Sequence, residues 1–374
     1  MDPYILIVDD EPERQGGLSV LEFGQSGVET GIYHPQEIKE EDLRRASVIA
    51  VDHFLENWSE LDRQTPALRP RNGFALAAVF RSQTLDRNPS PAIVIRTAKL
   101  LEIAEGIPVS SAEHLLAWQH NIEWVLPKAE SEEGQSEASR LTELARAVAE
   151  LEDLWAESLS VTTLATEWFG LGDQEWDEVA QRHIVETRPP LHSVAKQTHG
   201  ASVMRWFLHR VLPYPTFLID EWRVATRLGV TQRWLLEVLN GESELQQKLD
   251  ACSYSGVLKT FAGRRWWRAG LAFLVADATD GKPFNQTLLS HSLASLSGTE
   301  PELLREQRPV LALDPETLKA TVVIEADDAV RVAPDGWPVF ADDAWASRDD
   351  LSDDVYLAGL VLDPLDLSLE KEHS

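Results

Sequence analysis

The chain has 374 residues, enough for two or three domains, and its composition of 43% hydrophobic and 26% charged residues excludes a disordered protein. No apolar run reaches the roughly 18 to 20 residues of a membrane helix, and the acidic start lacks the basic segment of a signal peptide. The single cysteine, Cys252, cannot form an internal disulfide. We therefore expect a cytoplasmic protein that does not enter a membrane.

The net charge of −28 is unevenly distributed along the chain. Residues 181–275 carry 13 Lys and Arg against 7 Asp and Glu, a local charge of +6, whereas the segments on both sides are acidic. An acidic surface repels the phosphates of nucleic acid, but a basic segment attracts them. The basic segment could equally pair with the acidic segments of the same chain, and composition leaves both interpretations open.

Four short apolar runs in the first 130 residues are typical of strands that are buried on both faces of a parallel sheet. They are residues 4–8 (YILIV), 47–51 (SVIAV), 92–95 (AIVI) and 124–126 (WVL). Helix-compatible stretches separate them at 38–46, 74–81 and 112–120. The alternation predicts an α/β domain with a parallel sheet, in which ligands bind beyond the carboxyl ends of the strands.

The ends of these expected strands carry side chains that suit phosphoryl transfer. Asp9 and Asp10 follow the first run, Asp52 the second, Thr97 the third and Lys128 the fourth. Carboxylates are the hard oxygen ligands that Mg²⁺ prefers, while an ammonium and a hydroxyl can bind the oxygens of a phosphoryl group. An aspartate after a strand is usually only a turn or a helix cap, but five such residues in order indicate a functional site.

Residues 1–130 resemble the receiver domain of two-component response regulators in four segments: 4–12 (YILIVDDEP), 48–52 (VIAVD), 93–98 (IVIRTA) and 124–128 (WVLPK). The resemblance implies a doubly wound, flavodoxin-like parallel sheet. It also implies that Asp52 is the phosphoacceptor and binds Mg²⁺ together with Asp9 and Asp10. Thr97 and Lys128 would contact the phosphoryl group, which a histidine kinase or another phosphodonor would deliver.

Three features depart from the family pattern. The proline-glycine turn that closely follows the acceptor in the family has its best match at 69–75 (RPRNGFA), after an insertion that contains Asn57, Trp58 and Ser59. Val125 stands where the family usually has an aromatic residue, and Pro127 precedes Lys128 instead of following it. These departures leave open a receiver that keeps the fold without being phosphorylated.

Residues 131–160 are expected to form an acidic linker and a coupling helix. Apolar residues recur there with the 3-4 spacing of a heptad seam, at Leu141, Leu144, Val148, Leu151 and Trp155. The seam is shorter than the three or four heptads of a convincing coiled coil. The helix could pack on the sheet of its own receiver, or it could form a dimer contact through residues 141–155.

Residues 161–309 are expected to form a mainly helical output domain. Within it, residues 221–241 (EWRVATRLGVTQRWLLEVLNG) predict two short helices, with Gly229 ending the first and Thr231 capping the second. This segment resembles the helix-turn-helix of bacterial transcription regulators, which implies that Thr231, Gln232 and Arg233 contact DNA. A two-helix hairpin with a glycine turn is common in any helical domain, so a structural role for this segment stays open.

Residues 310–374 are expected to form an acidic, β-rich segment. The expected strands lie at 321–325, 329–333, 337–340 and 355–362, separated by Asp, Pro and Gly turns. This acidic segment could mimic the charge of nucleic acid, bind a basic partner, or cover the basic residues 181–275 in the resting state. Covering is the most economical hypothesis, because it gives a phosphorylation switch something to release.

The sequence as a whole predicts a phosphorylation-controlled response regulator whose output region binds DNA. The alternative is a signalling adaptor with the same receiver and a C-terminal region that binds a protein partner. The sequence contains no nucleophile elbow, phosphate-binding glycine loop or paired zinc motif. We therefore do not expect an independent enzyme.

Overall fold

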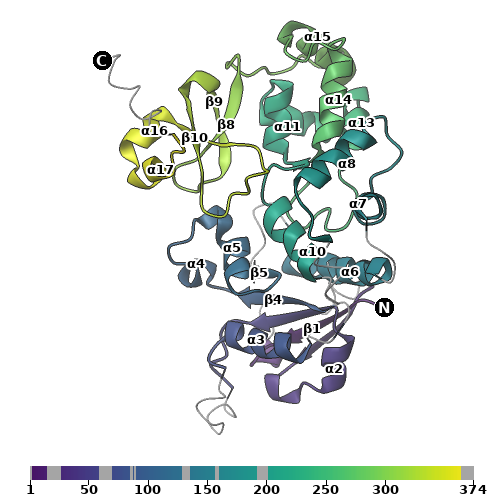
Figure 1. Cartoon of the computed structure of the whole chain (residues 1–374), viewed down its shortest axis with the longest axis vertical. Coiled ribbons are helices and arrows are strands. Elements are labelled where there is room, and N and C mark those ends of the chain that lie inside the picture. Colours follow the sequence, from purple (N-terminus) through teal and green to yellow (C-terminus); the bar gives the residue numbers. More distant parts are fainter. Residues whose placement is uncertain are drawn as a thin grey trace.

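The computed structural model describes residues 2–14, 27–58, 70–84, 87, 90–128, 135–155, 160–191 and 201–363. Figure 1 shows an N-terminal α/β unit, a helical middle part and a C-terminal part built on a second sheet. None of the described helices is long and apolar enough to cross a membrane.

The N-terminal unit is built on a five-stranded parallel sheet with the order β2-β1-β3-β4-β5, which is the flavodoxin-like order. Its strands are β1 (Tyr4–Val8), β2 (Glu29–Tyr33), β3 (Val48–Asp52), β4 (Ala92–Thr97) and β5 (Trp124–Pro127). This arrangement confirms the predicted parallel α/β sheet. The sequence does not predict β2, because this edge strand is only partly buried and lacks a continuous apolar run.

Helices cover both faces of the sheet. On one face lie α2 (Glu40–Arg45), α3 (Gly73–Gln83) and α5 (Ala112–Gln119), which pack on Ile49, Val51, Ile93 and Ile95. These three helices lie where the sequence predicts them, and a single helical turn, α4 (Leu100–Ile103), precedes α5. Short turns of 3-10 helix occur at η1 (Pro12–Arg14), η2 (Pro35–Glu37), η5 (Val109–Ser111) and η8 (Ala326–Asp328).

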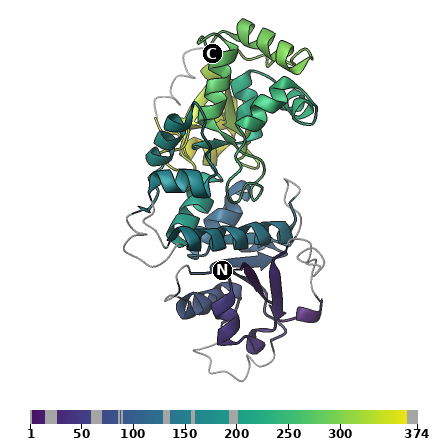
Figure 2. The same ribbon diagram turned by 90° about the vertical axis from the view of Figure 1, so that its right-hand side faces the viewer.

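Helix α6 (Glu137–Trp155) covers the opposite face and lies between the sheet and the middle part (Figure 2). Leu141, Leu144, Val148 and Leu151 are buried there together with strand residues such as Ile5 and Val94. The burial favours packing of the heptad seam on its own sheet. A dimer through residues 141–155 stays a prediction, and the side chain of Trp155 lies outside the described ones.

The apolar core continues from α6 into the middle part. It includes side chains from α7 (Val161–Thr163), η6 (Leu164–Trp168), α8 (Asp177–Glu186), α10 (Ala201–Trp206) and η7 (Phe207–Val211). The aromatic rings of Trp168, Phe169 and Phe207 are fully buried in this cluster. The N-terminal unit and the middle part therefore share one hydrophobic core.

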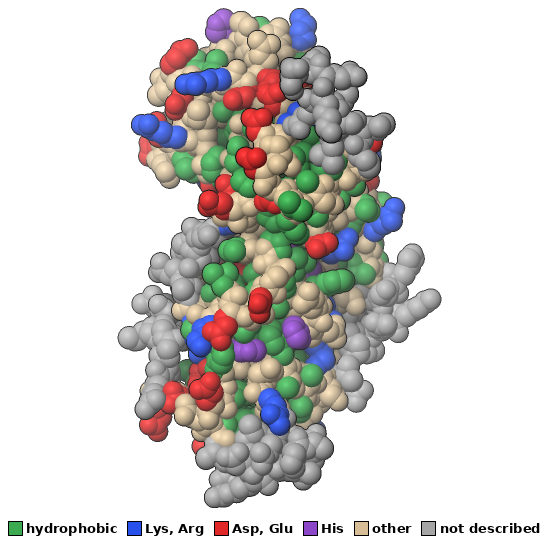
Figure 3. Space-filling view, turned by 90° about the vertical axis from the view of Figure 1, so that its left-hand side faces the viewer, with side chains coloured by type: hydrophobic (Ala, Val, Ile, Leu, Met, Phe, Trp, Pro, Cys, Tyr) green, Lys and Arg blue, Asp and Glu red, His purple; other side chains and the backbone are tan. Residues whose placement is uncertain are grey.

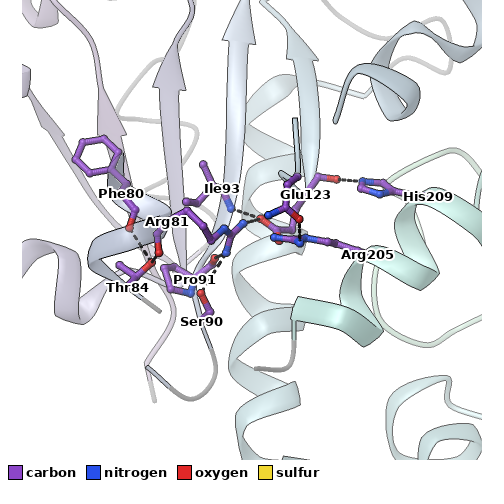
Figure 4. A network of polar contacts seen from close by, with 10 residues as sticks. Phe80, Arg81, Thr84, Ser90, Pro91, Ile93, Glu123, Arg205 and His209 are labelled. Carbon is purple, nitrogen blue, oxygen red and sulfur yellow. Dashed lines mark hydrogen bonds and ion pairs between the residues drawn. The ribbon is translucent and has the colours of Figure 1, made fainter. Parts of the chain in front are cut away.

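A buried polar network joins the same two parts (Figure 4). Glu123, just before β5, is fully buried and forms ion pairs with Arg81 of α3 and Arg205 of α10. Its side chain also accepts a hydrogen bond from the N–H of Ile93, and its backbone carbonyl bonds to His209 Nε2 at 2.8 Å. Two charges from the N-terminal unit and one from the middle part thus meet inside the protein.

The predicted two-helix hairpin is present. α11 (Glu221–Leu228) ends at Gly229, whose φ of +68° is the left-handed conformation that favours glycine, and Thr231 caps α12 (Gln232–Leu239) through the N–H of Trp234. The hairpin packs with α13 (Glu244–Ala251), α14 (Arg268–Ala278) and α15 (Gln286–Ser297) around a second helical core. A two-stranded ribbon, β6 (Leu218–Ile219) and β7 (Trp266–Trp267), links this core to the first.

The C-terminal part holds a four-stranded sheet with the order β10-β11-β8-β9. Its elements are β8 (Pro309–Leu313), β9 (Ala320–Glu325), β10 (Ala329–Val332), β11 (Ala344–Ser347), α16 (Arg348–Asp353) and α17 (Val355–Gly359). The structure confirms the strands that the sequence predicts at 321–325 and 329–333.

The other two predicted strands of this part are wrong. Residues 337–340 form a turn, because Gly336 has a φ of +78° and Pro338 has no N–H to donate to a strand. Residues 355–359 are helical, since the Asp354 side chain accepts hydrogen bonds from the N–H groups of Tyr356 and Leu357 and caps the helix. Burial of Leu357 beside an exposed Val355 follows from this helical turn.

Candidate functional site

Asp9, Asp10 and Asp52 meet at the carboxyl ends of β1 and β3. One carboxylate oxygen from each lies within 4.8 Å of those of the other two, and all three residues are buried. Adjacent parallel strands end at the same edge of the sheet, so the order of the strands is what gathers these residues. The structure thus brings together the three metal-binding residues that the sequence predicts.

The hydrogen bonds of the triad leave negative charge uncompensated. Asp9 Oδ1 accepts a hydrogen bond from the N–H of Glu11 at 2.9 Å, and Asp10 Oδ2 accepts one from the N–H of Asn57. Burial raises the pKa of Asp10, the Asn57 amide opposes the rise, and the charges of Asp9 and Asp52 add to it. Asp52 Oδ1 is buried and has no hydrogen-bond partner in the described part of the chain. An orphaned carboxylate oxygen within an acidic triad fits a bound cation.

Two basic side chains and a fourth carboxylate lie around the triad. Lys128 Nζ lies 2.8 Å from Asp52 Oδ2 and 3.7 Å from Asp9 Oδ2. Arg96 Nη1 lies 3.6 Å from Asp9 Oδ2, and the same guanidinium pairs with Glu137 of α6. With every group ionised, four carboxylates face two cations, so a divalent cation would bring the site to neutrality.

Thr97 is fully buried at the end of β4. Its Oγ1 accepts a hydrogen bond from the N–H of Lys99 at 3.1 Å, and no hydrogen bond joins it to Asp52 within the described chain. Together with Lys128 it lines a pocket of about 400 Å³ that also includes Leu100, Leu101 and Pro127. The Thr97 hydroxyl, which the sequence predicts to contact a phosphoryl group, therefore lies close to Lys128 and forms no hydrogen bond with Asp52 among the described residues.

The turn at Asn72 and Gly73 lies directly against the end of β3. The Asn72 side chain caps α3 through the N–H of Ala75. A Cβ atom on Gly73 would lie 2.4 Å from the carbonyl oxygen of Asp52 and 2.8 Å from the Cα of His53, so only glycine fits there. This contact supports the sequence match at 69–75, although Arg69 and the insertion from Ser59 onward lie outside the described residues.

His53 is a buried neighbour of Asp52 that the sequence pattern did not indicate. Its ring lies edge-on to Phe54 and Phe74, and its Nδ1 has no hydrogen-bond partner among the residues that the structure describes. Burial lowers its pKa, and the attraction of Asp52 only partly opposes this. A neutral imidazole therefore stands beside Asp52.

Val125 and Trp124 lie on opposite faces of β5. Val125 belongs to the core under α3 and α5, whereas Trp124 contacts the rings of His209 and Phe261 in the middle part. Trp124 Nε1 also donates a hydrogen bond to Glu113. The aromatic ring of β5 is therefore that of Trp124, which faces the middle part, while Val125 faces α3 and α5.

The three predicted DNA contacts lie at the start of α12. Thr231 binds Glu302 twice, through its hydroxyl at 2.9 Å and its N–H at 2.8 Å, and Gln232 donates to Glu221. Arg233 is exposed and pairs with Glu237 of the same helix. Carboxylates thus engage all three side chains.

The acidic C-terminal part does pair with the basic segment. Asp342 forms ion pairs with Arg227 of α11 and Arg268 at the start of α14, and its N–H donates to the carbonyl of Pro215. Trp337 packs against Tyr214 with ring centroids 5.1 Å apart. On the face of the molecule in Figure 3, Lys and Arg side chains lie scattered among acidic and apolar ones and do not gather into a patch.

Comparison of the chain with protein-family models, curated proteins and solved structures finds no match. The geometry itself is a parallel sheet of flavodoxin-like order with a buried acidic triad and a lysine at the carboxyl ends of its strands. This arrangement is consistent with a receiver-like fold.

Proposed function

We propose that this chain is a phosphorylation-controlled signalling protein whose phosphoacceptor is Asp52. The observation that carries the proposal is the buried triad of Asp9, Asp10 and Asp52, in which Asp52 Oδ1 has no hydrogen-bond partner among the described residues and Oδ2 lies 2.8 Å from Lys128. A histidine kinase or another phosphodonor would supply the phosphoryl group. The charge balance and the all-oxygen donor set favour Mg²⁺ as the resident cation.

In the proposed transfer, a carboxylate oxygen of Asp52 attacks the phosphorus of a phosphohistidine on the partner. An O–P bond forms as the P–N bond breaks, and the leaving imidazole keeps the electron pair and takes up a proton. When bound, Mg²⁺ offsets the charge on the phosphoryl oxygens. Asp9 and Asp10 would hold it, while the Lys128 ammonium binds a phosphoryl oxygen and Thr97 supplies a buried hydroxyl nearby.

For the output region we favour the adaptor hypothesis over DNA binding. A recognition helix needs free polar side chains at its N-terminus, and here Thr231 and Gln232 are bound to Glu302 and Glu221. Asp342 also occupies two arginines of the basic segment. Salt-dependent binding of the full chain to duplex DNA, weakened by Arg233→Ala, would restore the DNA hypothesis.

The proposal is tested by titrating the full chain with beryllofluoride, a phosphoryl mimic, with and without Mg²⁺. A ligand at about 100 times its Kd stabilises the folded state by about 2.7 kcal/mol, which a thermal unfolding curve resolves. We expect stabilisation that requires both ligands and is lost in Asp52→Asn. Asp328→Asn, which removes an exposed carboxylate of the C-terminal part, is the matched control. Equal stabilisation of wild type and Asp52→Asn would contradict the proposal.

A further inference from the structure

Arg96 is a charged residue inside an otherwise apolar strand. It stands in β4 after Ile93, Val94 and Ile95, and only 2% of its side chain is exposed. A buried guanidinium is retained only where carboxylates compensate it. Two carboxylates do so here, and they belong to different parts of the structure.

Among the described residues, Arg96 pairs with Glu137 and Asp9. Arg96 Nε donates to Glu137 Oε1, and Nη2 lies 3.5 Å from Oε2, so the pair is bidentate. The remaining nitrogen, Nη1, lies 3.6 Å from Asp9 Oδ2, which is longer than a hydrogen bond. Arg96 is therefore bound to Glu137 and only attracted to Asp9.

Glu137 lies in the first turn of α6, which connects the sheet with the middle part. Farther along this helix, Glu143 accepts hydrogen bonds from Thr260, and the carbonyl of Ala147 accepts one from Trp168 Nε1. The pair Arg96–Glu137 thus joins the acidic triad to a helix that contacts the output region. Val125 offers no aromatic ring for this purpose on the other face of β5.

A cation at the triad changes the forces on Arg96. With the triad empty, the charge of Asp9 draws the guanidinium toward the triad; a divalent cation cancels that attraction and repels the guanidinium toward Glu137. Arg96 and the cation therefore compete for Asp9, and Glu137 favours the cation because it holds the guanidinium away from Asp9. Linkage makes the effect reciprocal, because whatever holds Arg96 on Glu137 also favours the cation.

We propose that Arg96 is a positioning residue that couples occupation of the triad by a divalent cation to the first turn of α6 through Glu137. The proposal rests on the proposed function, since both assign the cation to the same three aspartates. It assigns a role to a buried arginine and a buried glutamate that the phosphoacceptor chemistry does not use.

The test measures two quantities in the full chain: the Kd of Mg²⁺ by calorimetry, and hydrogen exchange of the amides of residues 141–145 with and without Mg²⁺. In Glu137→Gln, Arg96 loses its charged partner and moves onto Asp9, so the Kd of Mg²⁺ should rise on the order of tenfold. Mg²⁺ should slow exchange in α6 of the wild type and not in this variant. The control is Glu113→Gln, which breaks the ion pair of Arg140 in α6 with α5 and leaves the triad untouched.

A second variant separates competition from loss of structure. Arg96→Met combined with Glu137→Met removes both charges and fills the space with apolar groups of similar size. Its Kd for Mg²⁺ should equal or fall below that of the wild type, while the exchange response of α6 is lost. A fold effect would instead weaken Mg²⁺ binding in both variants.

Each outcome decides a different claim. If the wild type binds Mg²⁺ in an Asp52-dependent way and Glu137→Gln binds it equally well, the coupling is wrong and the proposed function stands. The coupling is also wrong if the exchange response of α6 survives in the double variant. A wild type that binds no Mg²⁺ at Asp52 overturns both proposals.

Discussion

The buried network at Glu123 gives the sharpest stability prediction. Glu123→Gln keeps the size of the side chain and removes the charge that faces Arg81 and Arg205. Removing one partner of a buried ion pair costs about 3–5 kcal/mol, because the opposite charge is left without compensation. Arg81 keeps hydrogen bonds to Ser90 and Pro91, and Arg205 keeps one to Asn121, so we expect the lower end, about 3 kcal/mol.

The assay is urea unfolding followed by tryptophan fluorescence. An exposed pair serves as the control: Glu40→Gln breaks the contact with Arg44, and surface pairs of this kind contribute less than about 1 kcal/mol. Arg205→Met, which leaves Arg81 in place, should cost less than Glu123→Gln. A loss below about 1 kcal/mol for Glu123→Gln would refute the view that this network holds the two parts together.

The pH dependence of the same variant has a defined sign. Burial alone would raise the pKa of Glu123, but the attraction of Arg81 and Arg205 and the N–H of Ile93 outweigh it, so the pKa is lowered. The stabilisation is complete above the unfolded value of about 4.3 and is lost as the pH falls through the folded value. The difference between wild type and Glu123→Gln should therefore shrink below about pH 4.

Three further predictions concern the buried histidines His114 and His209, the contact between Gly73 and β3, and the ion pairs of Asp342. Burial lowers the pKa of His114 to about 3 and that of His209 to about 4, so both are neutral when folded and take up protons on unfolding below about pH 6.5. The free energy of unfolding should be at its full value above that pH and fall toward pH 5 by about 2 kcal/mol for each histidine. In urea unfolding, the double variant His114→Gln and His209→Gln should show a weaker dependence on pH, and an unchanged dependence would argue against this role of the two histidines. Gly73→Ala should displace β3 at Asp52 and raise the Kd of Mg²⁺, whereas Gly359→Ala, with no atom within 4 Å of the added Cβ, should leave this Kd unchanged. Equal Kd values for the two variants in calorimetry would contradict the importance of the contact between Gly73 and Asp52. Asp342→Asn leaves Arg227 and Arg268 without their shared carboxylate, so trypsin should cleave the chain between residues 210 and 270 faster. An unchanged cleavage rate would show that this carboxylate does not hold the C-terminal part against the basic segment.

Local pattern was enough to predict four of the five strands of the first sheet and its acidic end. Strands buried on both faces need continuous apolar runs, and the carboxyl ends of parallel strands meet, so the sequence alone could place Asp9, Asp10 and Asp52 together. The strand at 29–33 was beyond such reasoning, because an edge strand with exposed residues has no such run.

The charged residues that connect the parts could not be predicted from local pattern. Arg96 looks like the polar end of a strand, and its burial depends on Glu137, 41 positions away. Glu123 and Arg205 are 82 positions apart. The one local signal for Arg96 was that a charged residue directly follows the apolar residues Ile93, Val94 and Ile95. The helix at 355–359 could also have been predicted from the sequence, because Asp354 directly before it is a favourable N-cap residue.

The central claim is phosphorylation of Asp52, and mass spectrometry tests it most directly. The full chain is incubated with a small acyl phosphate and Mg²⁺, and the aspartyl phosphate is trapped by borohydride, which reduces it to homoserine. We predict modification at Asp52 that requires Mg²⁺, is absent in Asp52→Asn and falls sharply in Lys128→Met. Unmodified Asp52 under these conditions, or the same modification in Asp52→Asn, would contradict the account.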